Sequence, residues 1–200
     1  QMKGLSCGKN EAVHRRSITS TTFHVRDEII MVEGILRDDR CVDSFSVETG
    51  EKISPFIVHE IILRLLVEGP ELVIRDLEVD MKQVPRTQCI QTRDSLRQII
   101  GQRIAPGFSD MVKKNFGGPH GCAHLNALLL SMAPSCVQGY WAWRVSKPLT
   151  FEQASRGLDE RYLIDTCWVW RSGGDLERDL RARSENAQGS KQGNTREKQE

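Results

Sequence analysis

Two runs of alternating apolar residues on either side of a turn constrain the fold most strongly. Residues 57–68 place six side chains on one face at a period of two: Ile57, His59, Ile61, Leu63, Leu65 and Val67. Residues 72–81 alternate in the same way but slip by one position near Asp76, which predicts a β-bulge. The intervening Glu68-Gly69-Pro70-Glu71 predicts a turn. The pattern therefore indicates an antiparallel pair of strands.

Two further strands are expected before this pair. Residues 13–25 are rich in Thr, Ser, Val and Ile, the composition of a partly exposed strand. Residues 28–36 follow, with Ile29, Met31 and Ile35 interleaved with polar positions. The polar run Asp38-Asp39-Arg40 predicts a turn that ends this second strand.

After Pro85 the apolar period becomes helical. A short helix is expected from about Thr92, a second over residues 109–116 and a buried third over residues 125–132. A late strand is expected over residues 161–171. Strands followed by helices, without βαβ alternation, indicate an α+β fold, with an antiparallel sheet of about five strands packed against three or four helices.

Chain length and polarity predict one domain with polar ends. A chain of 200 residues is long enough for one well-buried domain. Residues 12–182 are assigned to it, and residues 1–11 to a flexible N-terminus. Residues 183–200 hold no large apolar residue, so we expect them to form a disordered tail.

The composition argues against several classes of partner. Lys and Arg number 28 against 27 Asp and Glu, a net charge of +1. A nucleic-acid binder would carry a basic excess, so no nucleic-acid partner is expected. No segment approaches the roughly 18 apolar residues of a membrane span, so no membrane partner is expected. Without an apolar signal segment at the start, we expect a cytoplasmic protein of bacterial type whose six cysteines are reduced thiols.

The most informative motif is a Gly-rich loop that runs into a helix. Gly117-Gly-Pro-His-Gly121 precedes Cys122, and His124 follows two residues later. The positive end of a helix lowers a thiol pKa, so Cys122 is a candidate nucleophile activated by His124 or His120. On a continuous helix Cys122 and His124 would point about 200° apart, so both could bind one metal only if Cys122 precedes the helix. The alternative is a tight turn with Cys122 packed as a small apolar residue.

Four tryptophans lie in two pairs, Trp141 with Trp143 and Trp168 with Trp170. Core packing is the commoner use of such residues. The alternative is a partner-binding patch, which would make the protein a non-catalytic interaction module.

A series of motifs resembles a known family. The series begins with His14-Arg15-Arg16 and continues through His59, Pro85, Cys89, Gly101-Gln-Arg-Ile-Ala-Pro106-Gly107-Phe108, Gly117-Gly-Pro-His-Gly-Cys122-Ala-His124-Leu125 and Ile164-Asp165-Thr166-Cys167-Trp168-Val169-Trp170-Arg171. Over about residues 13–180 the chain is similar to the bacterial family catalogued as domain of unknown function 2889. The resemblance implies no activity, because that family is uncharacterised. The family often has an acidic residue soon after the Gly-Cys-x-His-Leu motif, where this chain has Asn126 and Ala127.

The positions that match the family include three thiols and two imidazoles. They are Cys89, Cys122, His124, Cys167 and His59, the last as an alternate or outer ligand. Thiolate and imidazole suit zinc or iron, although no Cys-x-x-Cys pair is present among them. The resemblance thus implies a metal-binding protein, with a small-molecule ligand as its expected partner. A small-molecule enzyme with Cys122 as nucleophile remains the second hypothesis, and a non-catalytic interaction module that uses the tryptophans remains the third. Plain packing of the three thiols is the alternative to any site.

Overall fold

The computed structural model describes residues 11–148 and 163–183. The chain forms two compact units, residues 1–140 and residues 141–200. The predicted flexible residues 1–10, the predicted tail from residue 184 and residues 161–162 of the expected late strand lie outside the described residues. Within the described ranges, no helix is both long and apolar enough to cross a membrane.

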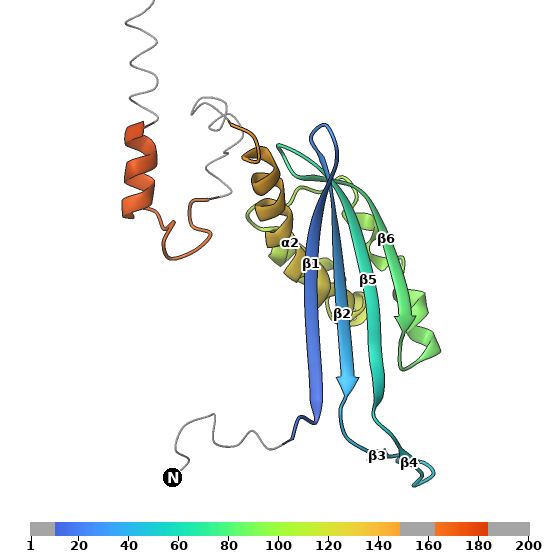
Figure 1. Ribbon diagram of the computed structural model, residues 1–200. Coiled ribbons are helices and arrows are strands. Elements are labelled where there is room, and N and C mark those ends of the chain that lie inside the picture. The colour runs from blue at the N-terminus through green and yellow to red at the C-terminus, as the bar shows by residue number, and fades with distance from the viewer. Residues whose placement is uncertain (1–10, 149–162, 184–200) are drawn as a thin grey trace, which may run out of the picture. The chain divides into compact units, whose positions relative to one another are not determined.

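The first unit is built on an antiparallel sheet of four long strands (Figure 1). In chain order they are β1 (His14–Arg26), β2 (Ile29–Arg40), β5 (Phe56–Glu68) and β6 (Val73–Gln83). Their spatial order is the same, so each strand pairs with its neighbour along the chain. A small second sheet, β3 (Ser44–Phe45) and β4 (Lys52–Ile53), lies within the connection between β2 and β5. The predicted α+β class is confirmed.

The alternating apolar residues of β5 form a buried face, and the bulge predicted for β6 is present. Ile61, Leu63, Leu65 and Val67 are fully buried on one face. The predicted slip near Asp76 is also confirmed, because Leu66 pairs with Asp76 whereas Val67 pairs with Ile74. One extra residue therefore bulges out of β6 at this point.

Strand β2 departs from the prediction in two ways. Its buried face carries Ile30, Val32 and Leu36 rather than the alternate set that begins at Ile29. The strand also continues through the predicted turn at residues 38–40, so that prediction is wrong. Pairing with β1 on one side and β5 on the other extends to Arg40, and this pairing satisfies the backbone of the polar run.

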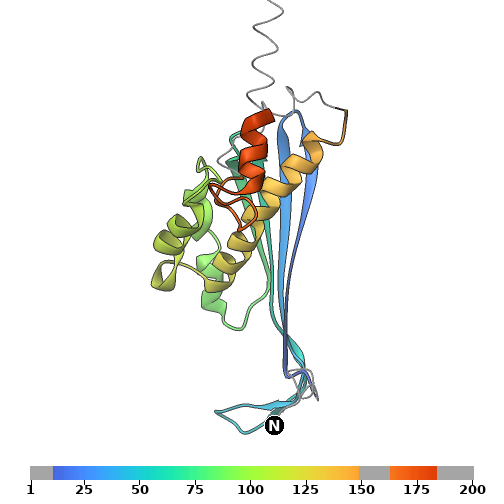
Figure 2. The ribbon, with the colours of Figure 1, turned by 90° about the vertical axis from the view of Figure 1, so that its left-hand side faces the viewer.

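Five helical segments follow the sheet between residues 87 and 144, and in Figure 2 they lie on one of its faces. They are the 3₁₀ turns η2 (Thr87–Thr92), η3 (Ser95–Ile99) and η4 (Gly118–His120) and the α-helices α1 (Phe108–Phe116) and α2 (Ala123–Arg144). The second and third predicted helices are confirmed, although α2 runs past residue 132 and through Pro134. The helix expected from Thr92 is replaced by two shorter turns, η2 and η3.

Helix α2 packs closely against the sheet through two glycines. A Cβ atom at Gly34 of β2 would overlap the side chains of Met132 and Leu128 in α2. A Cβ atom at Gly139 of α2 would overlap the side chain of Thr22 in β1. Small residues at both contacts therefore set how near the helix approaches the strands, and with that the position of its first turn.

In the second unit, residues 163–171 form turns, so the late strand is wrong for the part that the structure describes. Asp165 accepts hydrogen bonds from the backbone N–H and the hydroxyl of Ser172, which closes a compact loop. This local bonding competes with an extended backbone, because a short acidic side chain can satisfy backbone donors nearby. Trp168 is exposed, and the guanidinium of Arg171 lies over its ring at 4.1 Å.

Candidate metal centre

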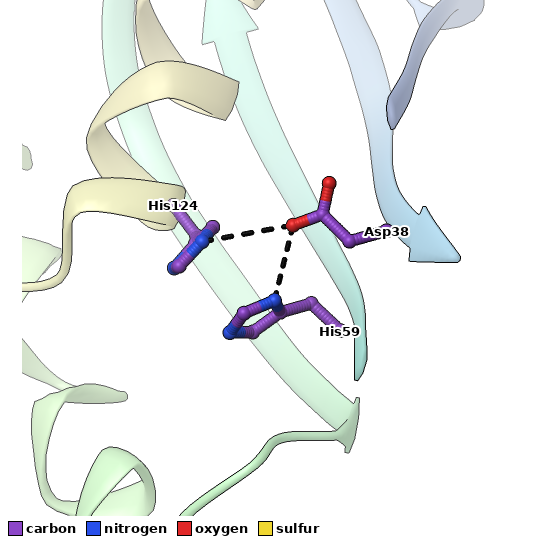
Figure 3. Close-up of side chains that lie close together, drawn as sticks. All are labelled: Asp38, His59 and His124. Carbon is purple, nitrogen blue, oxygen red and sulfur yellow. Dashed lines mark ion pairs between the residues drawn. The ribbon is translucent and has the colours of Figure 1, made fainter. Parts of the chain in front are cut away.

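One rung of the sheet carries three polar side chains from three strands. Asp38 of β2 pairs with Arg16 of β1 on one side and with His59 of β5 on the other. Directly opposed residues project from the same face of a sheet, so all three side chains face the helical layer. His124, in the first turn of α2, completes the group from the opposite layer (Figure 3).

The two imidazoles converge on a single oxygen of Asp38 (Figure 3). Nδ1 of His59 lies 3.0 Å from Oδ2, and Nε2 of His124 lies 3.6 Å from the same atom. The two rings stack with their centroids 3.7 Å apart. The exposed fraction is 2% for the side chain of Asp38, 12% for His59 and 26% for His124. The group is thus enclosed at the carboxylate and opens toward His124.

Arg16 keeps the buried carboxylate ionised. Its Nε donates to Oδ1 of Asp38 at 2.6 Å and its Nη2 to Oδ2 at 2.7 Å. These hydrogen bonds are the largest cause of a pKa of Asp38 below its usual value. The positive charges of Arg16, His59 and His124 act in the same direction and together outweigh burial, which favours the neutral acid. A carboxylate is therefore present at neutral pH.

The surroundings of His124 favour its neutral form. Burial is the largest cause of a pKa of His124 below its usual value. The positive charges of His59 and Arg16 lower the pKa further, and Asp38 opposes them. Because a metal binds the unprotonated nitrogen, the imidazole is in the state that a cation requires.

His59 provides a polar atom whose hydrogen-bonding capacity is unmet. Its Nδ1 is close to Asp38 but is not aligned for a hydrogen bond, and this buried atom makes none to the described residues. An unmet buried nitrogen carries a desolvation cost, which a ligand would remove.

Cys122 lies beside the group without joining it. Its Sγ is 3.9 Å from Nδ1 of His124, on the opposite side of the ring from the nitrogen that approaches Asp38. Cys122 immediately precedes α2, and its carbonyl accepts a hydrogen bond from the N–H of Asn126 in the first turn. Cys122 thus lies ahead of the helix, the condition under which it and His124 could bind one metal.

The structure brings together a set of possible ligands that differs from the set implied by the resemblance. In the part of the chain that the structure describes, one group of three His, Cys, Asp or Glu residues could hold a metal: Asp38, His59 and His124. Cys89 is part of the η2 turn, and Cys167 is exposed in the second unit. The group is therefore not based on cysteine, although it retains His59 and His124 from the predicted set. A catalytic role for Cys122 and His124 stays a prediction.

Sequence reasoning missed Asp38 because its polar neighbours predicted a turn. A usable signal was present in the alternation of β2. Extending the buried series through Leu36 places Asp38 at the next position on the same face. A carboxylate in such a position requires a partner, and the nearby basic cluster at residues 14–16 offered one.

A protein-family model described as "Protein of unknown function (DUF2889)" matches residues 14–138. The chain belongs to this family. The DUF2889 match confirms the resemblance over residues 14–138, which include Asp38, His59, Cys122 and His124, whereas Cys167 lies beyond its end. No curated protein and no solved structure matches the chain. The DUF2889 description states no activity, so a function has to be argued from the site.

Proposed function

We propose that this protein binds a divalent zinc or iron ion through Asp38, His59 and His124. The observation that supports the proposal is the convergence of two imidazole nitrogens on one carboxylate oxygen in an enclosed place. One ligand atom from each residue lies within 4.8 Å of the other two. The protonation states favour the same conclusion, since Asp38 is ionised and His124 has a lowered pKa.

The distances agree with those around a small ion. Bonds of about 2.0 to 2.2 Å in tetrahedral geometry place ligand atoms about 3.3 to 3.6 Å apart. The two contacts with Oδ2 of Asp38, at 3.0 and 3.6 Å, lie close to that range.

The ligand types indicate which metals and what kind of site. Two imidazoles and one carboxylate suit zinc or non-haem iron, whereas magnesium and calcium prefer oxygen. Structural zinc sites use four protein ligands, and catalytic sites leave a position for water or substrate. Three protein ligands thus favour a site that also takes a small molecule.

Metal analysis of protein purified without a histidine tag tests the proposal. We expect close to one equivalent of zinc or iron in the wild type, and a large loss in Asp38→Asn, His59→Ala and His124→Ala. His120→Ala is the matched control, since His120 lies in the adjoining η4 turn outside the group. A wild-type protein that neither retains nor takes up zinc or iron would overturn the proposal.

A second candidate is a thiol enzyme with Cys122 as nucleophile. The observation that favours it is the order of thiol, imidazole and carboxylate. Nδ1 of His124 faces Sγ of Cys122 at 3.9 Å, and Nε2 faces Oδ2 of Asp38 at 3.6 Å. In such an arrangement the imidazole takes the thiol proton and the carboxylate orients the imidazole. The two candidates make different use of Nε2, so bound metal and thiol reactivity distinguish them.

A further inference from the structure

Arg16 has more hydrogen-bond donors than Asp38 can use. A guanidinium carries five N–H donors. Asp38 accepts one from Nε and one from Nη2, and in the described part of the chain the other three make no hydrogen bond. The side chain is 41% exposed, and the three remaining N–H groups form a second edge of the guanidinium. Such an edge presents two parallel N–H groups, which matches the spacing of oxygens in a carboxylate or phosphate.

The second edge of Arg16, its free edge, includes Nη2, which also contacts the Asp38 oxygen that both imidazoles approach. Nη2 donates to Oδ2 of Asp38, the same atom approached by His59 and His124. A metal ion on that oxygen would therefore be close to Nη2. One carboxylate or phosphate is large enough to contact both.

The charges of the group favour an anion once a metal is bound. Arg16 already neutralises Asp38 through two hydrogen bonds. A divalent ion would leave the group positively charged in a partly buried place, which is costly without a counter-charge. The three protein ligands also leave part of the coordination shell for another group.

We propose that the metal-loaded site takes a small oxyanion, a carboxylate or a phosphate, bound to the metal and to the free edge of Arg16. This inference rests on the proposed metal site and names the class of its ligand. His14 lies at the same end of β1, with its Nε2 3.4 Å from Oδ1 of Asp38, and adds a polar side chain beside the carboxylate.

Calorimetric titration of acetate and of inorganic phosphate into zinc-loaded and metal-free protein tests the inference and separates the two anions. We expect at least one of them to bind the zinc-loaded wild type. In Arg16→Gln, zinc is retained and the affinity for that anion falls about tenfold or more, the scale of a lost charge-assisted hydrogen bond. Arg16→Lys keeps the positive charge but lacks the paired N–H groups of the guanidinium. It should therefore lose part of the affinity for the anion.

Arg15→Gln is the matched control, because Arg15 pairs with Asp39 on the opposite face of the same strand. It should bind zinc and the anion as the wild type does. An unchanged anion affinity in Arg16→Gln overturns the inference, and so does loss of zinc in folded Arg16→Gln and Arg16→Lys, since Arg16 would then only position Asp38. If the wild type takes up no metal, the proposed function fails by itself. If that metal-free protein still binds phosphate or acetate in a way that depends on Arg16, the anion site stands without the metal site. If it binds neither anion, the metal site and the anion site are both overturned.

Discussion

Asp38 and His59 face each other across neighbouring antiparallel strands, with Oδ2 of the carboxylate 3.0 Å from Nδ1 of the ring. The backbone register of β2 and β5 fixes this pair before any side chain is considered. His124 approaches the same oxygen from α2. Two candidate ligands are therefore positioned by strand pairing, and the position of the third depends on how the helix docks.

The first prediction concerns metal and thermal stability. Chelation with EDTA should lower the melting temperature of metal-loaded wild type, because an ion that binds only the folded state stabilises it by about 2.7 kcal/mol at 100 times Kd. His124→Ala should respond little to EDTA, and His120→Ala should respond as the wild type does. Differential scanning calorimetry measures the shift. Equal responses from wild type and His124→Ala would contradict the assigned ligands.

The second prediction concerns the pH dependence of the Arg16–Asp38 pair in metal-free protein. The pKa of Asp38 is lowered in the fold, so the pair stabilises above the unfolded value of about 3.9 and this contribution is lost as pH falls through the folded pKa. At neutral pH, Asp38→Asn should cost about 1 to 3 kcal/mol, the cost of unpairing a buried charged hydrogen bond.

Urea unfolding at several pH values checks this. The gap in unfolding free energy between wild type and Asp38→Asn should narrow as the pH falls below the unfolded pKa of about 3.9. In an Arg16→Gln background the same substitution should have a smaller effect, because its main partner is gone. A gap independent of pH would show that the carboxylate gains nothing from its surroundings.

The third prediction concerns the reactivity of two thiols, that of Cys136 in α2 and that of Cys122 immediately before it. Burial raises the pKa of Cys136 to about 12, so in native protein it should resist iodoacetamide at neutral pH. Cys122 is only partly buried and should be alkylated first. If the thiol-enzyme candidate is correct, His124→Ala slows alkylation of Cys122 without unfolding the protein. Mass spectrometry of alkylated peptides decides it, and an unreactive native Cys122 counts against that candidate.

The fourth prediction concerns the docking of α2. Gly139→Ala should destabilise the protein by about 1 to 3 kcal/mol, because the added methyl group overlaps Thr22 at a close helix–strand contact. Gln138→Ala, one residue earlier and exposed, should stay within about 0.5 kcal/mol of wild type. Chemical denaturation measures both. A silent Gly139→Ala would mean that the helix can move away from β1 at little cost.

The parts of the fold that could be predicted depend on residues that are close to one another in the sequence. The alternation of β5, the bulge at Asp76 and the helix before Phe116 each follow from side-chain periods within a single segment. The site depends on relations between segments. Asp38 follows Arg37 and precedes Asp39, which locally favours a turn, and only pairing with β1 and β5 places it on the buried face. His59 and His124 were identifiable by their chemistry, but the carboxylate between them was not.

The close approach of α2 to the strands at Gly34 also gives the site a mechanical role. A ligand bound by Asp38, His59 and His124 would connect the first turn of α2 to the sheet. This connection lies at the other end of the helix from the contact at Gly139. Occupancy should then slow the exchange of amide hydrogens early in α2, near Leu125, more than those late in β6. Amide exchange in the first turn of α2 would then show whether the site is occupied. Ligands could be screened by this measurement without a chromophore or a known substrate.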